Sequence, residues 1–326
     1  MSICATVGRP IETQIEACIH DGFVVFEHPT VHQSYLYHVL TALEPTWSKR
    51  GQTGSQMNLN TGLINGCLIP LPATEVEQRA IATALSDVDE LLAAQERLIA
   101  KKRDLKQAAM QQLLTGQTRL PGFSGEWEVK RLGSIAEFHK GKGLPKSALS
   151  PYGPEPCVHY GELFTQYGET IFETTNRTHS FAQEFRSIAN DVVMPTSDVT
   201  PCGLAKASCV ICDGVILGGD ILVIRTNPEL ICGPFLSYMI RREEDQVLRL
   251  VSGTTVFHLY GADMKKFSFK CPSIEEQQAV VNVLSDMDAE IAAHEARRAK
   301  TRDLKQAMMQ QLLTGRTRLI EPERAA

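Results

Sequence analysis

The segment HKGKGLPKS sets three lysines, Lys140, Lys142 and Lys146, around the glycines Gly141 and Gly143. Glycine lets a backbone approach a phosphate closely, and each lysine can displace a counterion from a nucleic acid. An ordinary solvated loop would have the same composition. The segment therefore predicts either a phosphate-contacting loop or a charged surface loop.

A second polar segment, HYGELFTQYG, offers side chains that can hydrogen-bond or pack against base edges. They are Tyr160, Glu162, Thr165 and Tyr167. A turn with half-buried tyrosines is the alternative interpretation, and the sequence does not separate the two.

Cys209 and Cys212 form a CxxC pair, with Cys202 and Cys232 nearby in sequence, which raises a zinc site as an alternative. Residues three apart on an extended strand point to opposite faces, and ASCVICDGVIL is apolar enough for a core. We therefore expect core cysteines and no bound metal.

The remaining residues contain no recognisable motif for catalysis or nucleotide binding. His139, His159 and His258 have neither a triad order nor a metal-ligand spacing. The GxxxxGK[ST] phosphate loop and the Asn-Pro-Pro-aromatic motif of adenine methyltransferases are absent from the sequence. We therefore expect a protein without catalysis or cofactor of its own.

Composition is that of an ordinary globular protein. The chain has 326 residues, 43% hydrophobic and 22% charged, which is room for about two domains. Nine cysteines without a secretory signal suggest reduced thiols, and no targeting or membrane segment is visible. We expect no membrane association and a cytoplasmic location.

The net charge of −5 argues against a protein that coats nucleic acid, but its distribution is uneven. Basic residues outnumber acidic ones between residues 101 and 150. This pattern fits one nucleic-acid-facing surface, whereas a solvated helix face would equally explain the basic residues at 101–106.

The chain contains an internal duplication. RDLKQAAMQQLLTGQTRL begins at Arg103 and recurs as RDLKQAMMQQLLTGRTRL at Arg302; in full, residues 77–120 align with 276–319 without a gap, and about 28 of 44 positions are identical. Each copy opens with a capping-box pattern, in which Thr74 or Ser273 precedes Glu77 or Glu276. Each copy is therefore predicted to start as a helix.

Each copy then continues without proline or glycine to Gly116 or Gly315, which predicts a long helix. A bend or second cap at Ser86–Asp87 and Ser285–Asp286 stays open. The predicted apolar stripes are Val88, Leu91, Leu92, Leu98, Leu105, Ala109 and Leu113 on the first helix, and Met287, Ile291, Leu304, Met308 and Leu312 on the second.

Stripe spacings of three, four and seven imply a helical partner. The simplest arrangement pairs the two long helices with each other as an antiparallel coiled coil. Arg297 and Arg298, in the places of Leu98 and Ile99, make its middle weak. The alternative is that each helix packs on a domain of its own.

Residues 121–271 have the texture of a mixed α/β domain, with short apolar runs such as PCVHYGELF, DVVMP and GVILGGDILVIR between turns. The first 71 residues match only the C-terminal half of this domain: SYLYHVL parallels PFLSYMI, and GQTGSQMNLN stands near the place of SGTTVFHLY. The first domain is therefore expected to be partial.

The order of domain, helix, domain, helix, with EQQAVVNVLSDMDAEI, GEWEVKRLGSIAEF and KGKGLPKSALSPYG, resembles the specificity subunit of Type I restriction-modification systems over essentially the whole chain. The resemblance implies target-recognition domains that each read half of a bipartite site in double-stranded DNA. It also implies that the helices space these domains and dock methyltransferase (modification) subunits, in a complex with a restriction subunit.

The resemblance points to one further candidate DNA-facing segment, and the sequence departs from the family pattern in one respect. Ser252, Thr254 and Thr255, in SGTT, resemble a polar segment that faces DNA in such domains, although they could simply cap a helix. The first domain has no counterpart of GEWEVKRLGSIAEFHKGKG, so a truncated allele, a late annotated start, and completion by a second copy or a complementing specificity chain are all open.

We therefore expect an α/β protein whose recognition domains are joined by two long helices in an antiparallel coiled coil, acting as a non-catalytic DNA-binding specificity subunit. The alternative is a degenerate subunit that binds partners without productive DNA recognition. The expected boundaries are 1–71 for a partial recognition domain, 72–120 for the central repeat, 121–271 for a complete recognition domain, 272–320 for the C-terminal repeat, and 321–326 for a tail.

Overall fold

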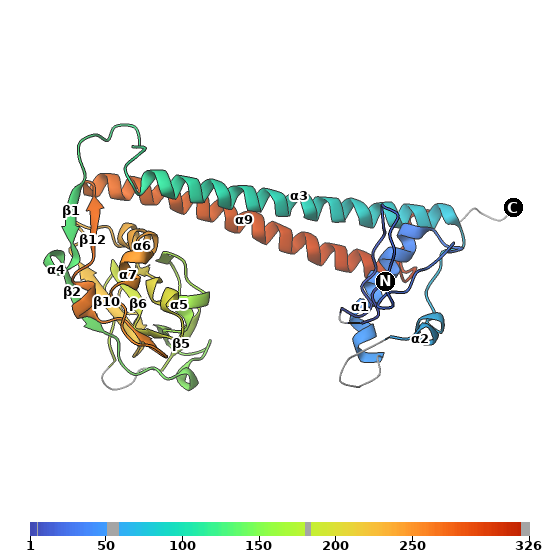
Figure 1. The fold of residues 1–326 in the computed structure, drawn as a ribbon, viewed down its shortest axis with the longest axis horizontal. Coiled ribbons are helices and arrows are strands. Elements are labelled where there is room, and N and C mark those ends of the chain that lie inside the picture. The colour runs from blue at the N-terminus through green and yellow to red at the C-terminus, as the bar shows by residue number, and fades with distance from the viewer. Residues whose placement is uncertain (5, 51–58, 180–183, 321–326) are drawn as a thin grey trace. The chain divides into compact units, whose positions relative to one another are not determined.

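The structure is a computed structural model that describes residues 1–4, 6–50, 59–179 and 184–320. GQTGSQMN at 51–58 and the predicted tail lie outside the described residues. The chain divides into two compact units, residues 1–103 with 290–326 and residues 104–289, so the long helices α3 (Glu75–Leu113) and α9 (Ile274–Leu312) contribute to both (Figure 1).

In each unit the segments of α3 and α9 pair antiparallel, because partner numbers rise on one helix as they fall on the other. In the first unit Lys305 Nζ donates to Asp89 at 2.5 Å, and Gln95 Nε2 donates to Thr301 Oγ1 at 3.1 Å. In the second unit Lys106 Nζ donates to Asp288 at 2.6 Å. The prediction that the duplicated helices pair with each other is confirmed.

Both helices run unbroken through the LSD segments that could have bent them. The capping boxes form only in part: the hydroxyl groups of Thr74 and Ser273 accept the amides of Glu77 and Glu276 at 3.3 and 3.4 Å. The two carboxylates do not return to the cap. They bind Arg119 and Arg318, which follow the end of the opposite helix, because ion pairing satisfies a buried carboxylate better than one amide.

The predicted stripes are right at most positions and wrong at four leucines. Leu91, Leu98, Leu105 and Leu304 are exposed, whereas Gln95 and Ile99 are buried. The buried and half-buried positions of α3 recur at alternating spacings of three and four, and this seam includes polar residues that hydrogen-bond or ion-pair across it. The other eight residues of the predicted stripes are buried or half-buried on this seam: Val88, Leu92, Ala109, Leu113, Met287, Ile291, Met308 and Leu312. Apolar residue type therefore located the face but added four leucines that lie beside it.

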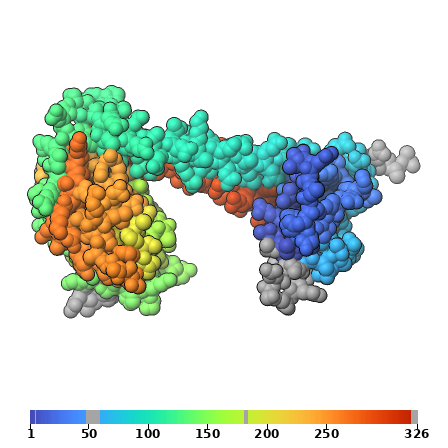
Figure 2. All heavy atoms as spheres, viewed as in Figure 1, coloured from blue at the N-terminus to red at the C-terminus, as the bar shows by residue number. Residues whose placement is uncertain are grey.

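The first unit also contains α1 (Gln33–Arg50) and α2 (Thr61–Asn65). Its described residues before α1 form one isolated bridge, Ser2 to Phe23. Tyr35 and Val39 of α1 form a core with Ile81 and Leu85 of α3 and with the end of α9, so α1 packs on the paired helices. In Figure 2 the N-terminal residues of this unit, in dark blue, lie against these helices. No helix in the described part of the chain is long and apolar enough to cross a membrane.

The second unit is a mixed α/β domain, as predicted, and a five-stranded sheet in the order β2-β10-β6-β8-β4 lies at its centre. The strands are β1 (Glu128–Arg131), β2 (Ala136–Lys140), β3 (Glu155–Val158), β4 (Thr170–Ile171), β5 (Asn176–Thr178), β6 (Asp191–Pro195), β7 (Ser197–Asp198), β8 (Ser208–Val210), β9 (Ile216–Leu217), β10 (Ile221–Thr226), β11 (Phe257–His258) and β12 (Ser268–Cys271). The helices are α4 (Leu132–Ile135), α5 (Glu162–Thr165), α6 (Gly233–Arg242), α7 (Glu244–Leu248), α8 (Gly261–Met264) and the 3-10 turns η1 (Lys146–Ala148) and η2 (Pro201–Ala205).

The strand predictions hold for DVVMP and for most of GVILGGDILVIR, but PCVHYGELF becomes a strand only to Val158. The helix α6 and the neighbouring segments of α3 and α9 cover one side of the sheet around a core that includes Val192, Ile224, Phe235 and Leu284. The buried hydrophobic residues of β6 and β10 match the continuous apolar runs in their sequences.

Burial predicts how the second unit responds to mutation of α9. Leu284→Ala removes a fully buried side chain, so we expect a loss of about 2–5 kcal/mol in the free energy of unfolding. The matched change Leu304→Ala, at an exposed position of the same helix, should cost under about 0.5 kcal/mol. Denaturant unfolding followed by circular dichroism measures both. Equal losses would place Leu304 in a core and contradict the seam.

Candidate nucleic-acid interface

The lysine segment follows directly from the end of β2. Lys140 ends the strand opposite Leu222 of β10, and Gly141 N then donates to Ile221 O at 2.9 Å. A Cβ at Gly141 would lie 2.0 Å from Gly218 O, so only glycine lets the loop pass this close to the β9–β10 connection. Lys142 N also donates to Leu217 O at 3.0 Å, which fixes the loop on the sheet.

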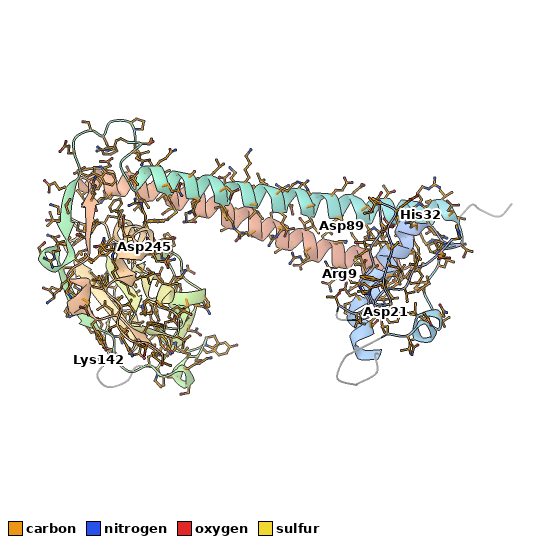
Figure 3. All side chains as sticks on the ribbon, viewed as in Figure 1. Arg9, Asp21, His32, Asp89, Lys142 and Asp245 are labelled. Atoms are coloured by element: carbon orange, nitrogen blue, oxygen red, sulfur yellow. The ribbon has the colours of Figure 1, made fainter. Side chains whose placement is uncertain are left out.

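All three lysine side chains are exposed. Lys140 lies 3.7 Å from Asp220, a surface ion pair that is worth little in water. Within the described residues, neither Lys142 nor Lys146 has an ion-pair partner, so both charges are free to meet an anion. Figure 3 shows Lys142 at the end of the second unit away from the segments of α3 and α9 in that unit.

The SGTT segment reaches the same end of the sheet by another route. The end of β6 pairs with the start of β10 at Pro195 and Ile221, and β7 follows immediately after β6. The short strand β11 pairs with β7, which anchors a loop closed by mutual hydrogen bonds between the backbones of Ser252 and His258. Because β2 and β6 both run antiparallel to β10, the C-terminal ends of β2 and β6 lie at the same end of the sheet, beside the start of β10.

Ser252, Thr254 and Thr255 are exposed in this loop. These three residues do not cap the following helix. The N-cap residue of α8 is Tyr260, and it makes no side-chain cap hydrogen bond. The loop therefore presents its hydroxyl groups at the surface.

The tyrosine segment begins at the end of β3, where Gly218 N donates to Val158 O at 3.0 Å beside the lysine loop. Glu162 is buried, and its carboxylate accepts hydrogen bonds from His159 N at 2.7 Å and Asn176 Nδ2 at 2.8 Å. This carboxylate therefore holds the segment together from inside.

The other members of this segment differ in exposure. Tyr160 is half-buried against the neighbouring core, and Thr165 is exposed at the end of α5. The Tyr167 hydroxyl accepts Thr175 N at 2.9 Å, and burial raises the pKa of Tyr167 above its ordinary value. The half-buried tyrosines of the alternative interpretation are present, and Thr165 is the member most open to a ligand.

An aromatic pair at this end of the sheet was not predicted from the sequence. His258 and Tyr260 stack with ring centroids 6.1 Å apart and an interplanar angle of 22°, and the Tyr260 side chain is exposed. Residues two apart on an extended segment face the same side, so the spacing H-x-Y next to SGTT was the available signal. Exposed aromatic faces can stack on bases.

The CxxC pair does not form a metal site in the structure. Cys209 is buried in β8, where burial raises the pKa of its thiol, and Cys212 is exposed in the following turn. Within the described ranges, no group of three histidine, cysteine or acidic residues is arranged to hold a metal ion.

Comparisons with known proteins identify the family. Residues 124–301, more than half of the chain, match the model of the Type I restriction modification DNA specificity domain. The chain belongs to this family. The matched region contains all three candidate segments.

The relatives extend the match along the chain. The putative type I restriction enzyme MjaX specificity subunit of Methanocaldococcus jannaschii is 25% identical over 81% of this chain, and the chain spans 63% of its length. The MjaVIII specificity subunit of the same organism is 22% identical over 87% of this chain, and the match covers 70% of the length of that subunit.

Solved structures show the same fold. The S subunit of a type I restriction-modification system from M. genitalium has a TM-score of 0.59 and 16% identity, covering 86% of this chain and 72% of its own. A chain from a study of complex assembly in a type I R-M system has a TM-score of 0.56 and 19% identity, covering 88% and 72%. The expected fold class, recognition domain with paired long helices, is confirmed.

The free lysines give the first test of the interface. Lys142→Ala should weaken binding to all DNA sequences and make the dependence of log K on log salt shallower by about 0.9, the change for one phosphate contact. Fluorescence anisotropy on duplex DNA at several salt concentrations measures this in the assembled complex. The matched variant Lys270→Ala, exposed on β12, should leave the slope unchanged. An unchanged slope for Lys142→Ala would remove the loop from the interface.

Proposed function

We propose that this chain is the non-catalytic DNA-recognition subunit of a type I restriction-modification complex. One observation carries the proposal. At one end of its sheet, a domain of this specificity family gathers two lysines without an ion-pair partner among the described residues, an exposed hydroxyl loop, and a stacked His258–Tyr260 pair whose tyrosine is exposed. Lysines would contact phosphates, and the hydroxyl and aromatic groups would meet base edges.

The roles of individual residues are part of this proposal. Lys140, Lys142 and Lys146 position the domain on the DNA backbone. Thr165 and the loop of Ser252, Thr254 and Thr255 supply contacts that distinguish bases. Tyr160, Glu162 and Tyr167 set the shape of the second polar segment, and we keep the exposed edges of the two tyrosines as candidate contacts.

Partner subunits would bind the paired helices. In the first unit Leu91 and Leu98 are seven residues apart on α3 and are exposed, which is the pattern of a face that packs against another helix. We infer that methyltransferase subunits occupy this face and that the nuclease subunit joins the complex they form. The cytoplasm, where such a complex meets DNA, is the location that this function implies.

The alternative, a subunit that binds partners without productive recognition, is not favoured. The match to the specificity domain includes the candidate interface as well as much of α9. The domain boundaries predicted above stay a proposal, with residues 121–271 as the complete reader.

Co-expression with the neighbouring methyltransferase subunit in a host that lacks adenine methylation tests the function. Mapping methylated adenines across the genome should give a motif with the unmodified chain. A bipartite asymmetric motif would mean that both units read DNA, and a palindrome would point to two copies of the second unit.

The triple variant Lys140→Ala, Lys142→Ala and Lys146→Ala should lose most of the methylation, while Lys270→Ala should keep it. A stable complex that methylates no motif would contradict the proposed function.

A further inference from the structure

The two copies of the repeat end in the same backbone conformation but in different surroundings. Gly116 and Gly315 occupy equivalent positions with φ of +70° and +71°. A Cβ at Gly116 would lie 3.2 Å from Trp127, which covers it, whereas a Cβ at Gly315 would meet no described atom within 4 Å. The place that a tryptophan fills in the second unit is open in the first.

The arginines that follow show the same difference. Arg119 binds Glu276 at 2.5 Å, and its guanidinium lies over the Trp127 ring at 5.8 Å. Arg318 binds the equivalent Glu77 at 2.5 Å. The Arg119 side chain is 22% exposed and that of Arg318 is 49% exposed. Arg318 is therefore positioned to stack on an aromatic ring, and the described residues place none there.

A segment of the first unit near this space also lacks the strand pairing that its counterpart in the second unit has. In the second unit β12 pairs with β1, so Cys271 is only 3% exposed. The corresponding segment of the first unit is Leu68–Leu71. In it, Leu71 is 53% exposed and Leu68 is 95% exposed. Ile69 nevertheless packs on the core, as Phe269 does. Within the described part of the chain, no backbone hydrogen bond reaches Ile69 or Leu71.

Pro70 has no backbone N–H, but the alternation of hydrogen-bonded and non-hydrogen-bonded pairs still allows Leu68–Leu71 to pair with a strand. Leu132 N donates to Phe267 O at 2.9 Å, and this pair fixes Val129–Lys270 as a pair without mutual hydrogen bonds. Gln78 Nε2 donates to Pro72 O at 3.1 Å, as Gln277 Nε2 donates to Pro272 O at 2.9 Å, so Pro72 corresponds to Pro272 and Ala73 is one extra residue before the repeat. Pro70 therefore stands at the place of Lys270, and its missing N–H is not needed. The Pro70 carbonyl points the other way and accepts the Tyr35 hydroxyl at 2.9 Å.

We propose that Leu68–Leu71 together with Gly315–Leu319 bind an extended segment of a separate polypeptide, with a tryptophan immediately before a strand like β1. Its backbone pairs with Ile69 and Leu71, and its tryptophan covers Gly315 beneath Arg318. The chain's own tryptophans are both engaged: Trp47 is buried in the first unit, and Trp127 packs on Phe235 in the second. This proposal does not depend on DNA recognition.

A labelled peptide, PGFSGEWEVKRLG, titrated into the full chain tests the proposal by fluorescence anisotropy. We expect saturable binding that falls about tenfold or more when alanine replaces the peptide's tryptophan, since buried aromatic anchors dominate such interfaces. Leu71→Asp and Arg318→Ala in the chain should each weaken binding. Val256→Asp, at an exposed apolar site in the second unit, should not.

A photoreactive phenylalanine in place of the peptide's tryptophan locates the contact. Crosslinks to 315–319 or 68–71 support the proposal, and crosslinks to 116–120 would overturn it by showing displacement of the chain's own β1. Absent binding, or binding that ignores Leu71→Asp and the tryptophan, would also overturn it. A crosslink between Trp127 of one copy and Gly315 of another would assign the surface to self-association instead.

Discussion

A buried carboxylate bound by an arginine from the opposite repeat is the constraint on which this fold depends. Glu77 and Glu276 each stand in the first turn of a long helix with 2% of the side chain exposed, and Arg318 and Arg119 bind them. A carboxylate without a partner at such a site would be strongly unfavourable. Each helix can therefore start in its buried position only when the end of the other helix lies beside it, which fixes direction and register together.

The duplication repeats this arrangement and attaches it to the surrounding domain in the same way. Gln78 and Gln277 follow the two glutamates, and their amide oxygens accept the backbone N–H of His32 and Cys232 at 2.8 and 2.9 Å, just before α1 and α6. Each long helix thus holds a domain helix by a buried amide. What differs between the units is therefore outside this common framework: the lysine and hydroxyl loops of the second, and the open strand edge of the first.

The sequence was enough to predict the duplicated helices and their antiparallel pairing, because 28 or so identical positions and helix-spaced residues are local signals. It did not predict the polar members of the pairing face, since Gln95 and Lys106 enter the seam by bonding to Thr301 and Asp288, partners remote in sequence. The same limit applied to the site. Residue types marked Lys142 and Thr254, but their common sheet edge depends on how β10 pairs with β2 and β6.

The most direct test of this account is the register of the helix pair within one chain. Gln95→Cys with Thr301→Cys, oxidised and digested, should give an intramolecular disulfide between the peptides that contain these positions, because the native side chains are in contact across the seam. Gln95→Cys with Met308→Cys, one heptad further along α9, should not. A disulfide in the shifted pair, or one that forms only between chains, would contradict the pairing on which both units are built.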